Sequence, residues 1–123
     1  VYYVDGSVNV DIREEFKSRM EKNDDVIIVA SYGTFSTGIS IKNIHNIFFT
    51  ESFKSEVIIR QSIGRGLRKH ESKDIVKIYD FIDDFRYKAE DHDWVNYVYR
   101  HGIARRTIYK EEKFPFEVQN IRF

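Results

Sequence analysis

The sequence predicts an α/β fold: a three-layer domain with a mostly parallel sheet, followed by a helical extension. Short apolar runs alternate with helical patterns along the first two-thirds of the 123 residues, which is typical of βαβ units. The apolar runs contain few polar residues, as strands covered on both faces do. A chain of this length with 41% hydrophobic residues suffices for one core and not for two ordinary domains.

The individual elements follow in chain order. Residues 1–4 predict a first strand. Asp11 and Glu14 are spaced as in a capping box, and apolar residues recur at helical spacing behind them, which predicts a helix that ends near residue 23. Further strands are predicted near 26–30, 46–50 and 76–81, with a helix over about 56–69 between the last two.

The character of the chain changes after residue 82. Residues 71–93 hold eight acids against four bases, and residues 100–113 hold five bases against two acids. A set of mostly apolar residues then recurs near one face at helical spacing: Trp94, Tyr97, Val98, His101, Ala104 and Ile108. We therefore expect a domain over 1–84 and a mainly helical extension over 85–123, whose helix stops at Phe114–Pro115.

The composition excludes several classes of protein. The formal net charge is zero, so any anion site must be local. The absence of cysteine excludes disulfides and thiolate metal sites, and no apolar run approaches the roughly 20 residues of a membrane span. The four histidines show no spacing that indicates a metal site. We expect a soluble, cytoplasmic protein with no metal site of its own and no membrane partner.

Gln61–Arg68 is the segment that carries the most chemical information. Gln61, Arg65 and Arg68 lie at i, i+4 and i+7 on the predicted helix. An apolar stripe lies roughly opposite them: Ile59, Ile63 and Leu67. Two arginines one turn apart can clamp a terminal phosphate by charge-assisted, bidentate hydrogen bonds. Glycine inside a helix costs about 1 kcal/mol relative to alanine, so Gly64 and Gly66 indicate close approach to the backbone. The alternative is that these residues form a solvated basic face of the helix. Spacing alone does not discriminate between a phosphate site and such a face.

A second polar segment, residues 30–40, follows the apolar strand 26–30. Ligands of open parallel sheets bind at the carboxyl ends of strands, and small hydroxyl residues and glycines leave backbone N–H groups accessible to phosphate oxygens. Gly33 to Gly38 followed by Ile39 and Ser40 imitates a phosphate-binding P-loop, but isoleucine cannot replace its lysine, so we reject that interpretation. The alternative is an ordinary polar βα turn.

Both segments resemble known motifs in the order of one family. Residues 61–68 resemble motif VI of superfamily-two helicases, Q-x-x-G-R-x-x-R, matched at Gln61, Gly64, Arg65 and Arg68. Residues 30–40 resemble motif V, and residues 79–84 add to a narrower resemblance to phage helicases of the UvsW type over about 1–84. The resemblance implies the second RecA-like (P-loop NTPase-type) domain of such a helicase.

The resemblance also implies a role for each matched residue. Arg68 resembles the arginine finger, Arg65 its neighbour on the γ-phosphate of ATP, and Gln61 a coupling residue. It further implies nucleotide contacts at Gly38, Ser40 and Gly64, and nucleic-acid contacts at Ser31, Thr37 and Gly38. Ser40 stands where the family frequently has aspartate.

The cofactors and partners are likewise those that the resemblance implies. The sequence has no P-loop and no acidic metal motif, so ATP and Mg²⁺ would be held mainly by the N-terminal RecA-like domain of the same protein, and this chain alone would not hydrolyse ATP. The implied substrate is single-stranded or branched DNA, or an RNA/DNA hybrid, in repair and recombination. The alternative is a non-enzymatic nucleic-acid-binding module. An upstream coding sequence with a P-loop and an acidic motif would discriminate between them.

The basic residues of the extension suggest a second contact with nucleic acid. Arg105 and Arg106 are expected to add weak, sequence-independent affinity, with nearby tyrosines able to stack on bases. The acidic residues of 80–93 are expected to face away from the bound nucleic-acid strand. The alternative is that the apolar stripe docks the helix while its basic face is merely solvated.

Overall fold

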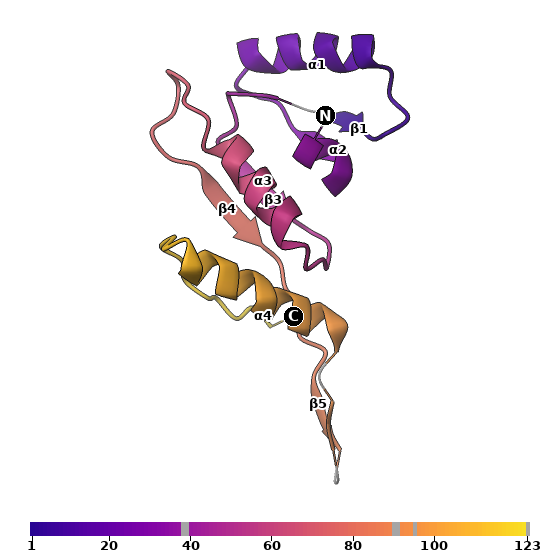
Figure 1. The fold of residues 1–123 in the computed structure, drawn as a ribbon, viewed down its shortest axis with the longest axis vertical. Helices are drawn as coiled ribbons and strands as arrows, with labels where there is room; N and C mark the ends of the chain where they lie inside the picture. Colours follow the sequence, from indigo (N-terminus) through magenta and orange to yellow (C-terminus); the bar gives the residue numbers. More distant parts are fainter. Residues whose placement is uncertain (38–39, 90–91, 95, 123) are drawn as a thin grey trace. The chain divides into compact units, whose positions relative to one another are not determined.

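The structure, a computed structural model, describes residues 1–37, 40–89, 92–94 and 96–122. Its helices and strands alternate along most of the chain (Figure 1). In chain order they are β1 (Tyr2–Val4), α1 (Val10–Lys22), β2 (Ile28–Ala30), α2 (Tyr32–Thr37), β3 (Asn46–Phe49), α3 (Glu56–Gly66), β4 (Lys77–Asp80), β5 (Tyr87–Ala89), β6 (His92–Trp94) and α4 (Tyr97–Glu111).

The chain divides into two compact units. The first unit comprises Val1–Phe49 and Val57–Asp80, and the second comprises Thr50–Glu56 and Phe81–Phe123. The change of unit at residue 80 lies near the boundary at residue 84 that composition suggested. The connection between β3 and α3, which we call the β3–α3 segment (Thr50–Glu56), belongs with the second unit although the elements on either side of it belong mostly to the first.

The first unit contains the four predicted strands, and they pair in parallel. β1 pairs with β2, and β3 pairs with β4. Helices separate the strands along the chain, so the predicted α/β class is confirmed. Among the described residues the strands form two separate parallel pairs, not the one continuous sheet that we expected. The strands are also shorter than predicted, with only three or four residues each.

Each strand pair is covered on one face only. The ring of Phe16 on α1 lies 4.9 Å from that of Tyr2 on β1, and Val4 on the same side is buried. The opposite sides of the two pairs carry the register partners Tyr3 and Val29, and Phe48 and Tyr79, all exposed. The expectation of three layers is therefore not met by the described residues, because these side chains remain 41 to 62% exposed.

Helix α3 packs closely on the sheet formed by β3 and β4 (Figure 1). A Cβ atom built on Gly66 would lie 2.7 Å from Cδ1 of Ile47 and 3.1 Å from Cγ1 of Val76, so glycine permits this approach. Lys73 donates to the carbonyl oxygens of Gly66 (2.6 Å) and Ile44 (2.9 Å), and thereby joins the end of α3 to the segment before β3.

The predicted helix over 56–69 is too long. Helix α3 ends at Gly66, so Leu67 and Arg68 lie in the turn that follows. The physical reason is the glycine at the last helical position, whose carbonyl group is bound by the Lys73 ammonium instead of by a further helical turn. Leu67, expected on the apolar stripe, is consequently exposed, whereas Ile59 and Ile63 are buried.

The second unit contains a hairpin that the sequence did not predict. β5 and β6 pair in antiparallel register over residues placed in a mainly helical extension. The Asn96 side chain accepts from the N–H of Tyr99 at 2.8 Å, so α4 begins at Tyr97 and Trp94 lies in β6 instead of on a helix. The helix ends at Glu111, and Lys113 adopts a left-handed φ of 56° just before Phe114–Pro115, which confirms the predicted stop.

The buried side of α4 matches the predicted stripe only in part, at Ile108. Gly102, Arg105, Ile108 and Tyr109 are buried, whereas Tyr97 is 77% exposed. A Cβ atom on Gly102 would lie 2.5 to 2.7 Å from three side-chain atoms of Ile82, so this position accepts only glycine without rearrangement. In the part of the chain that the structure describes, no helix is long and apolar enough to cross a membrane.

Candidate functional site

The two polar segments singled out in the sequence meet in the first unit. Nε of Arg65 donates to the carbonyl oxygen of Ser36 at 3.0 Å, and Nη1 of Arg68 donates to Oγ of Ser40. The partners are 29 and 28 residues apart in the chain, so these are tertiary contacts. The fold therefore places the two arginines against the segment that follows β2.

The two guanidinium groups are close enough to influence one another. Burial, and then the positive charge of Arg68, lower the pKa of Arg65 from its ordinary value. Arginine still remains protonated at neutral pH, so two positive charges coexist here. A bound anion would offset their repulsion and accept charge-assisted hydrogen bonds from either group. Arg68 is exposed and Arg65 half-buried, so the pair is accessible from solvent.

The segment after β2 is more ordered than a polar loop. It contains the short helix α2, in which the N–H of Phe35 donates to the carbonyl oxygen of Ser31 at 2.9 Å. The hydroxyl groups also bond locally, from Ser31 to Thr34 Oγ1 at 2.9 Å and from Ser36 to the carbonyl oxygen of Gly33 at 3.2 Å. The backbone N–H of Phe35 is therefore engaged within α2 and is not accessible to a phosphate oxygen.

The remaining predicted contacts of this segment are only partly described. Ser31 is exposed at the carboxyl end of β2, where the sequence placed it. Gly38 lies outside the described residues, as does the side chain of Thr37. Ser40 is half-buried and accepts from Arg68, so it lies beside the arginine pair.

Gln61 and Gly64 lie on the exposed side of α3, away from the buried Ile59 and Ile63. A Cβ atom built on Gly64 would meet nothing within 4 Å. Gly66 differs, since its own packing against Ile47 explains why it is glycine. The packing of this chain gives no reason for glycine at position 64, and the open space beside it is available to a bound group.

The structure corrects the prediction for Arg105. This side chain is 0% exposed, and its Nη1 and Nη2 atoms donate to the carbonyl oxygens of Phe53 (2.7 Å) and Phe81 (3.4 Å). A buried guanidinium cannot reach a nucleic-acid phosphate, so Arg105 is a structural residue here. Arg106 is half-buried, and its charge helps to lower the pKa of Asp84. Asp84, one residue of the acidic stretch, is therefore close enough to Arg106 for the two charges to interact.

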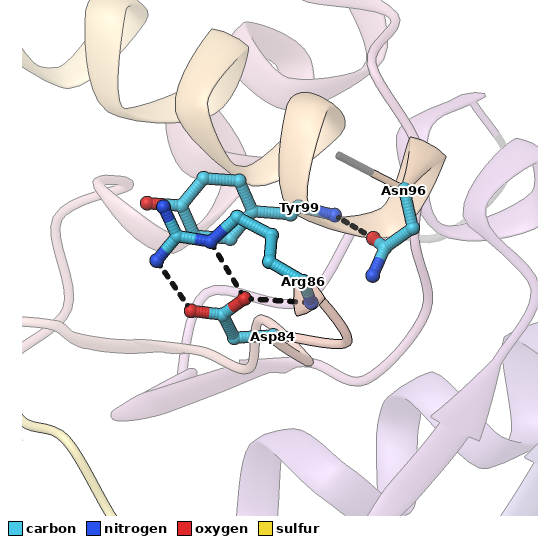
Figure 2. A network of polar contacts seen from close by, with 4 residues as sticks. All are labelled: Asp84, Arg86, Asn96 and Tyr99. Carbon is cyan, nitrogen blue, oxygen red and sulfur yellow. Dashed lines mark hydrogen bonds and ion pairs between the residues drawn. The ribbon is translucent and has the colours of Figure 1, made fainter. Parts of the chain in front are cut away.

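A polar network at the base of the β5–β6 hairpin was also missed (Figure 2). Arg86 donates to both carboxylate oxygens of Asp84, from Nε at 2.7 Å and from Nη2 at 2.6 Å, and its guanidinium carbon lies 3.8 Å from the ring centroid of Tyr99. Asn96, which caps α4, bonds to the backbone of the same tyrosine. The network thus joins the irregular segment before the hairpin, residues 81–86, to the helix after it.

This network predicts an abnormal titration of Asp84. Hydrogen bonds from the Arg86 side chain hold the pKa of Asp84 below its ordinary value of 3.8. Because the folded-state pKa is lowered, the ion pair contributes stability above pH 3.8 and loses it as the pH falls through the folded-state pKa. Arg86→Gln should raise the pKa of Asp84 toward 3.8 in an NMR titration of the carboxyl carbon. Arg100→Gln, an exposed charge loss on α4, is the control, and an unchanged titration in Arg86→Gln would contradict the assignment.

Three of the four histidines take part in polar contacts. Nε2 of His45 and Nδ1 of His70 lie 3.1 and 2.8 Å from Oγ of Ser72, and Nδ1 of His101 lies 2.9 Å from Oγ of Ser52. The side chain of His92 lies outside the described residues. Within the described ranges, no three His, Asp or Glu side chains are grouped as a metal site requires.

Comparison with known proteins supports the resemblance to helicases. The chain is 42% identical, over 98% of its length, to the ATP-dependent DNA helicase UvsW of Enterobacteria phage T4. It is 41% identical, over 50% of its length, to the putative ATP-dependent helicase IRC3 of Saccharomyces cerevisiae. The chain spans 25% of the first relative and 9% of the second. No protein-family model and no solved structure matches it.

The similarity to UvsW reaches well past residue 84, where the recognisable motifs end. Because 98% of the chain aligns, most of the extension with its hairpin and α4 is included. The resemblance predicted from the motifs is thus confirmed, and the chain is similar over nearly its whole length to about a quarter of a phage ATP-dependent DNA helicase.

Proposed function

We propose that this chain is the second, carboxyl-terminal RecA-like motor domain of an ATP-dependent DNA helicase or branch-migration translocase. The observation that carries the proposal is the meeting of Arg65 and Arg68 with Ser36 and Ser40, because it joins the two motif-like segments into one anion-accepting surface. The similarity to UvsW, which is named an ATP-dependent DNA helicase, supports the assignment of that surface to a helicase motor domain.

In this proposal the arginine pair acts on a nucleotide held by another domain. ATP is bound with Mg²⁺ by an N-terminal RecA-like domain of the same protein, and Arg68 is the arginine finger that stabilises charge on the transferring phosphoryl group. Arg65 supports it, and Gln61 couples the nucleotide to nucleic acid. Two features fit a nucleotide at this place: the mutual repulsion of the guanidiniums and the open space beside Gly64.

The nucleic-acid side of the proposal rests on the segment after β2. Ser31, Thr37 and Gly38 contact the backbone of single-stranded or branched DNA, or of an RNA/DNA hybrid, and Arg106 adds nonspecific affinity. The exposed position of Ser31 at the end of β2 supports its role. Arg105 has no part in this surface, since it is buried.

The proposal is tested by ATP hydrolysis with the full-length protein and with this chain alone. We expect the full-length protein to hydrolyse ATP faster when single-stranded or branched DNA is added, and residues 1–123 alone to show no turnover. DNA binding without any ATP hydrolysis by the full-length protein would instead support a non-enzymatic binding module. ATP hydrolysis by the isolated chain would contradict the proposal that another domain holds ATP and Mg²⁺ while this chain supplies the arginine finger.

A further inference from the structure

Helix α4 holds two segments that leave neighbouring strands. β3 and β4 are adjacent, with Phe49 opposite Asp80 in the parallel register. The chain continues from β3 into the β3–α3 segment and from β4 into residue 81. One guanidinium, that of Arg105, donates to a carbonyl oxygen in each continuation, at Phe53 (2.7 Å) and at Phe81 (3.4 Å). From a single position on α4, Arg105 therefore joins the segment that follows β3 to the segment that follows β4.

A second contact from the same helix holds the same segment. His101 lies on α4, four residues before Arg105. Its Nδ1 atom is 2.9 Å from Oγ of Ser52. The guanidinium carbon of Arg105 also lies 5.6 Å from the ring centroid of Phe53. The β3–α3 segment is thus bound at consecutive residues, through a side chain, a carbonyl oxygen and an aromatic ring.

The chemistry of these contacts requires arginine. Burying a cation is unfavourable unless its N–H groups are bonded, so a side chain needed only to fill space would be apolar. A planar guanidinium presents several N–H donors in a fixed fork and can bond to two carbonyl oxygens at once. A lysine ammonium at the end of a flexible chain would hold these carbonyl groups less rigidly. The buried arginine therefore indicates that the fold requires the segments after β3 and β4 to be held in a fixed position relative to each other.

The β3–α3 segment leads directly into the helix with the proposed active arginines. α3 starts at Glu56, the last residue of that segment, and carries Gln61 and Arg65, with Arg68 in the turn after it. We propose that Arg105 is a positioning residue: by fixing the β3–α3 segment it sets the placement of α3, and thereby of Arg65 and Arg68, for ATP hydrolysis. This inference rests on the function proposed above.

The inference also assigns a use to the extension. Through Ser52 and Phe53, α4 would constrain the residues that lead into α3. A small displacement of a group that acts on a transferring phosphoryl is costly, because about 1 Å of misplacement can reduce a rate by as much as about 100-fold.

The test compares Arg105→Lys and Arg105→Met in the full-length protein. We expect kcat for ATP to fall about 10- to 100-fold, with KM for ATP and the affinity for DNA changed less than about threefold, and with Arg105→Lys retaining more activity than Arg105→Met. Arg100→Met, an exposed arginine on the same helix, is the matched control. Ser52→Ala, which removes the second contact, should lower kcat in the same direction by a smaller factor.

Amide hydrogen exchange separates positioning from general destabilisation. In Arg105→Lys, amides of residues 51–58 should exchange about tenfold faster while those of α1 remain unchanged. Uniformly faster exchange with an unchanged kcat per folded molecule would overturn the proposal, as would parental kcat in both Arg105→Lys and Ser52→Ala. If Arg68→Ala hydrolysed ATP at the parental rate, the proposed function itself would fail, whatever the Arg105 variants do.

Discussion

Arg68→Ala in the full-length protein is expected to lower kcat for ATP hydrolysis by about 10³- to 10⁵-fold, the range that arginine fingers contribute in other phosphoryl-transfer systems. The loss should appear in kcat because a finger contacts charge that develops mainly in the transition state. Steady-state kinetics with saturating DNA measure it. Affinity for single-stranded DNA should change little, since Arg68 is not among the proposed nucleic-acid contacts.

The structure predicts that this variant still folds. Arg68 is exposed and lies in the turn after α3, and its hydrogen bond to Ser40 is a surface contact. Substitutions at such places usually change the free energy of unfolding by no more than about 0.5 kcal/mol. Arg65→Ala differs, because it also removes the hydrogen bond to the carbonyl oxygen of Ser36 and should cost about 1 kcal/mol in addition to activity.

Two further variants control for charge alone. Lys69→Ala removes an exposed positive charge one residue away and should leave turnover near the parental rate. Arg68→Lys keeps the charge but loses the planar fork, so it should recover only a small part of the activity. Parental turnover in Arg68→Ala would rule out the finger assignment. An equal loss in Lys69→Ala would show that the local positive field, and not a specific contact, supports hydrolysis.

The parts of the fold predicted well are those with strong local signals. The apolar strands near 1–4, 26–30, 46–50 and 76–81 are all present, and α4 stops before Phe114–Pro115 as expected. The end of α3 was misplaced because the binding of the Gly66 carbonyl by Lys73 is a tertiary contact, seven residues away, that helical spacing does not reveal. The β5–β6 hairpin was missed because residues 87–94 hold few apolar residues, so their alternation is weak.

For the candidate site, the sequence singled out two arginines, whose role remains a prediction, but not all of their surroundings. Arg65 and Arg68 came from a motif, and their contacts with Ser36 and Ser40 are compatible with it. Arg105 was misjudged because a basic residue on an amphipathic helix looks the same in sequence whether it faces solvent or buried carbonyl groups. Only the fold shows that Phe53 and Phe81 bring two carbonyl oxygens to it.

Gly64→Ala should change stability and activity in opposite directions. A methyl group at position 64 meets nothing within 4 Å, and alanine favours a helix over glycine by about 1 kcal/mol, so the free energy of unfolding should rise by about that amount. If the nucleotide approaches this backbone as proposed, the same methyl group would displace it, and kcat should fall by about 100-fold. Denaturant unfolding and steady-state ATP hydrolysis measure the two effects separately.

Gly66→Ala, two residues further along α3, is the matched comparison. Its Cβ atom would lie 2.7 Å from Ile47 and 3.1 Å from Val76, so the substitution should overpack the α3–sheet contact and lower the free energy of unfolding by about 1 to 3 kcal/mol. The two glycines therefore separate packing from function within one helix. A Gly64→Ala protein that is more stable and hydrolyses ATP at the parental rate would show that no bound group needs the open space beside α3.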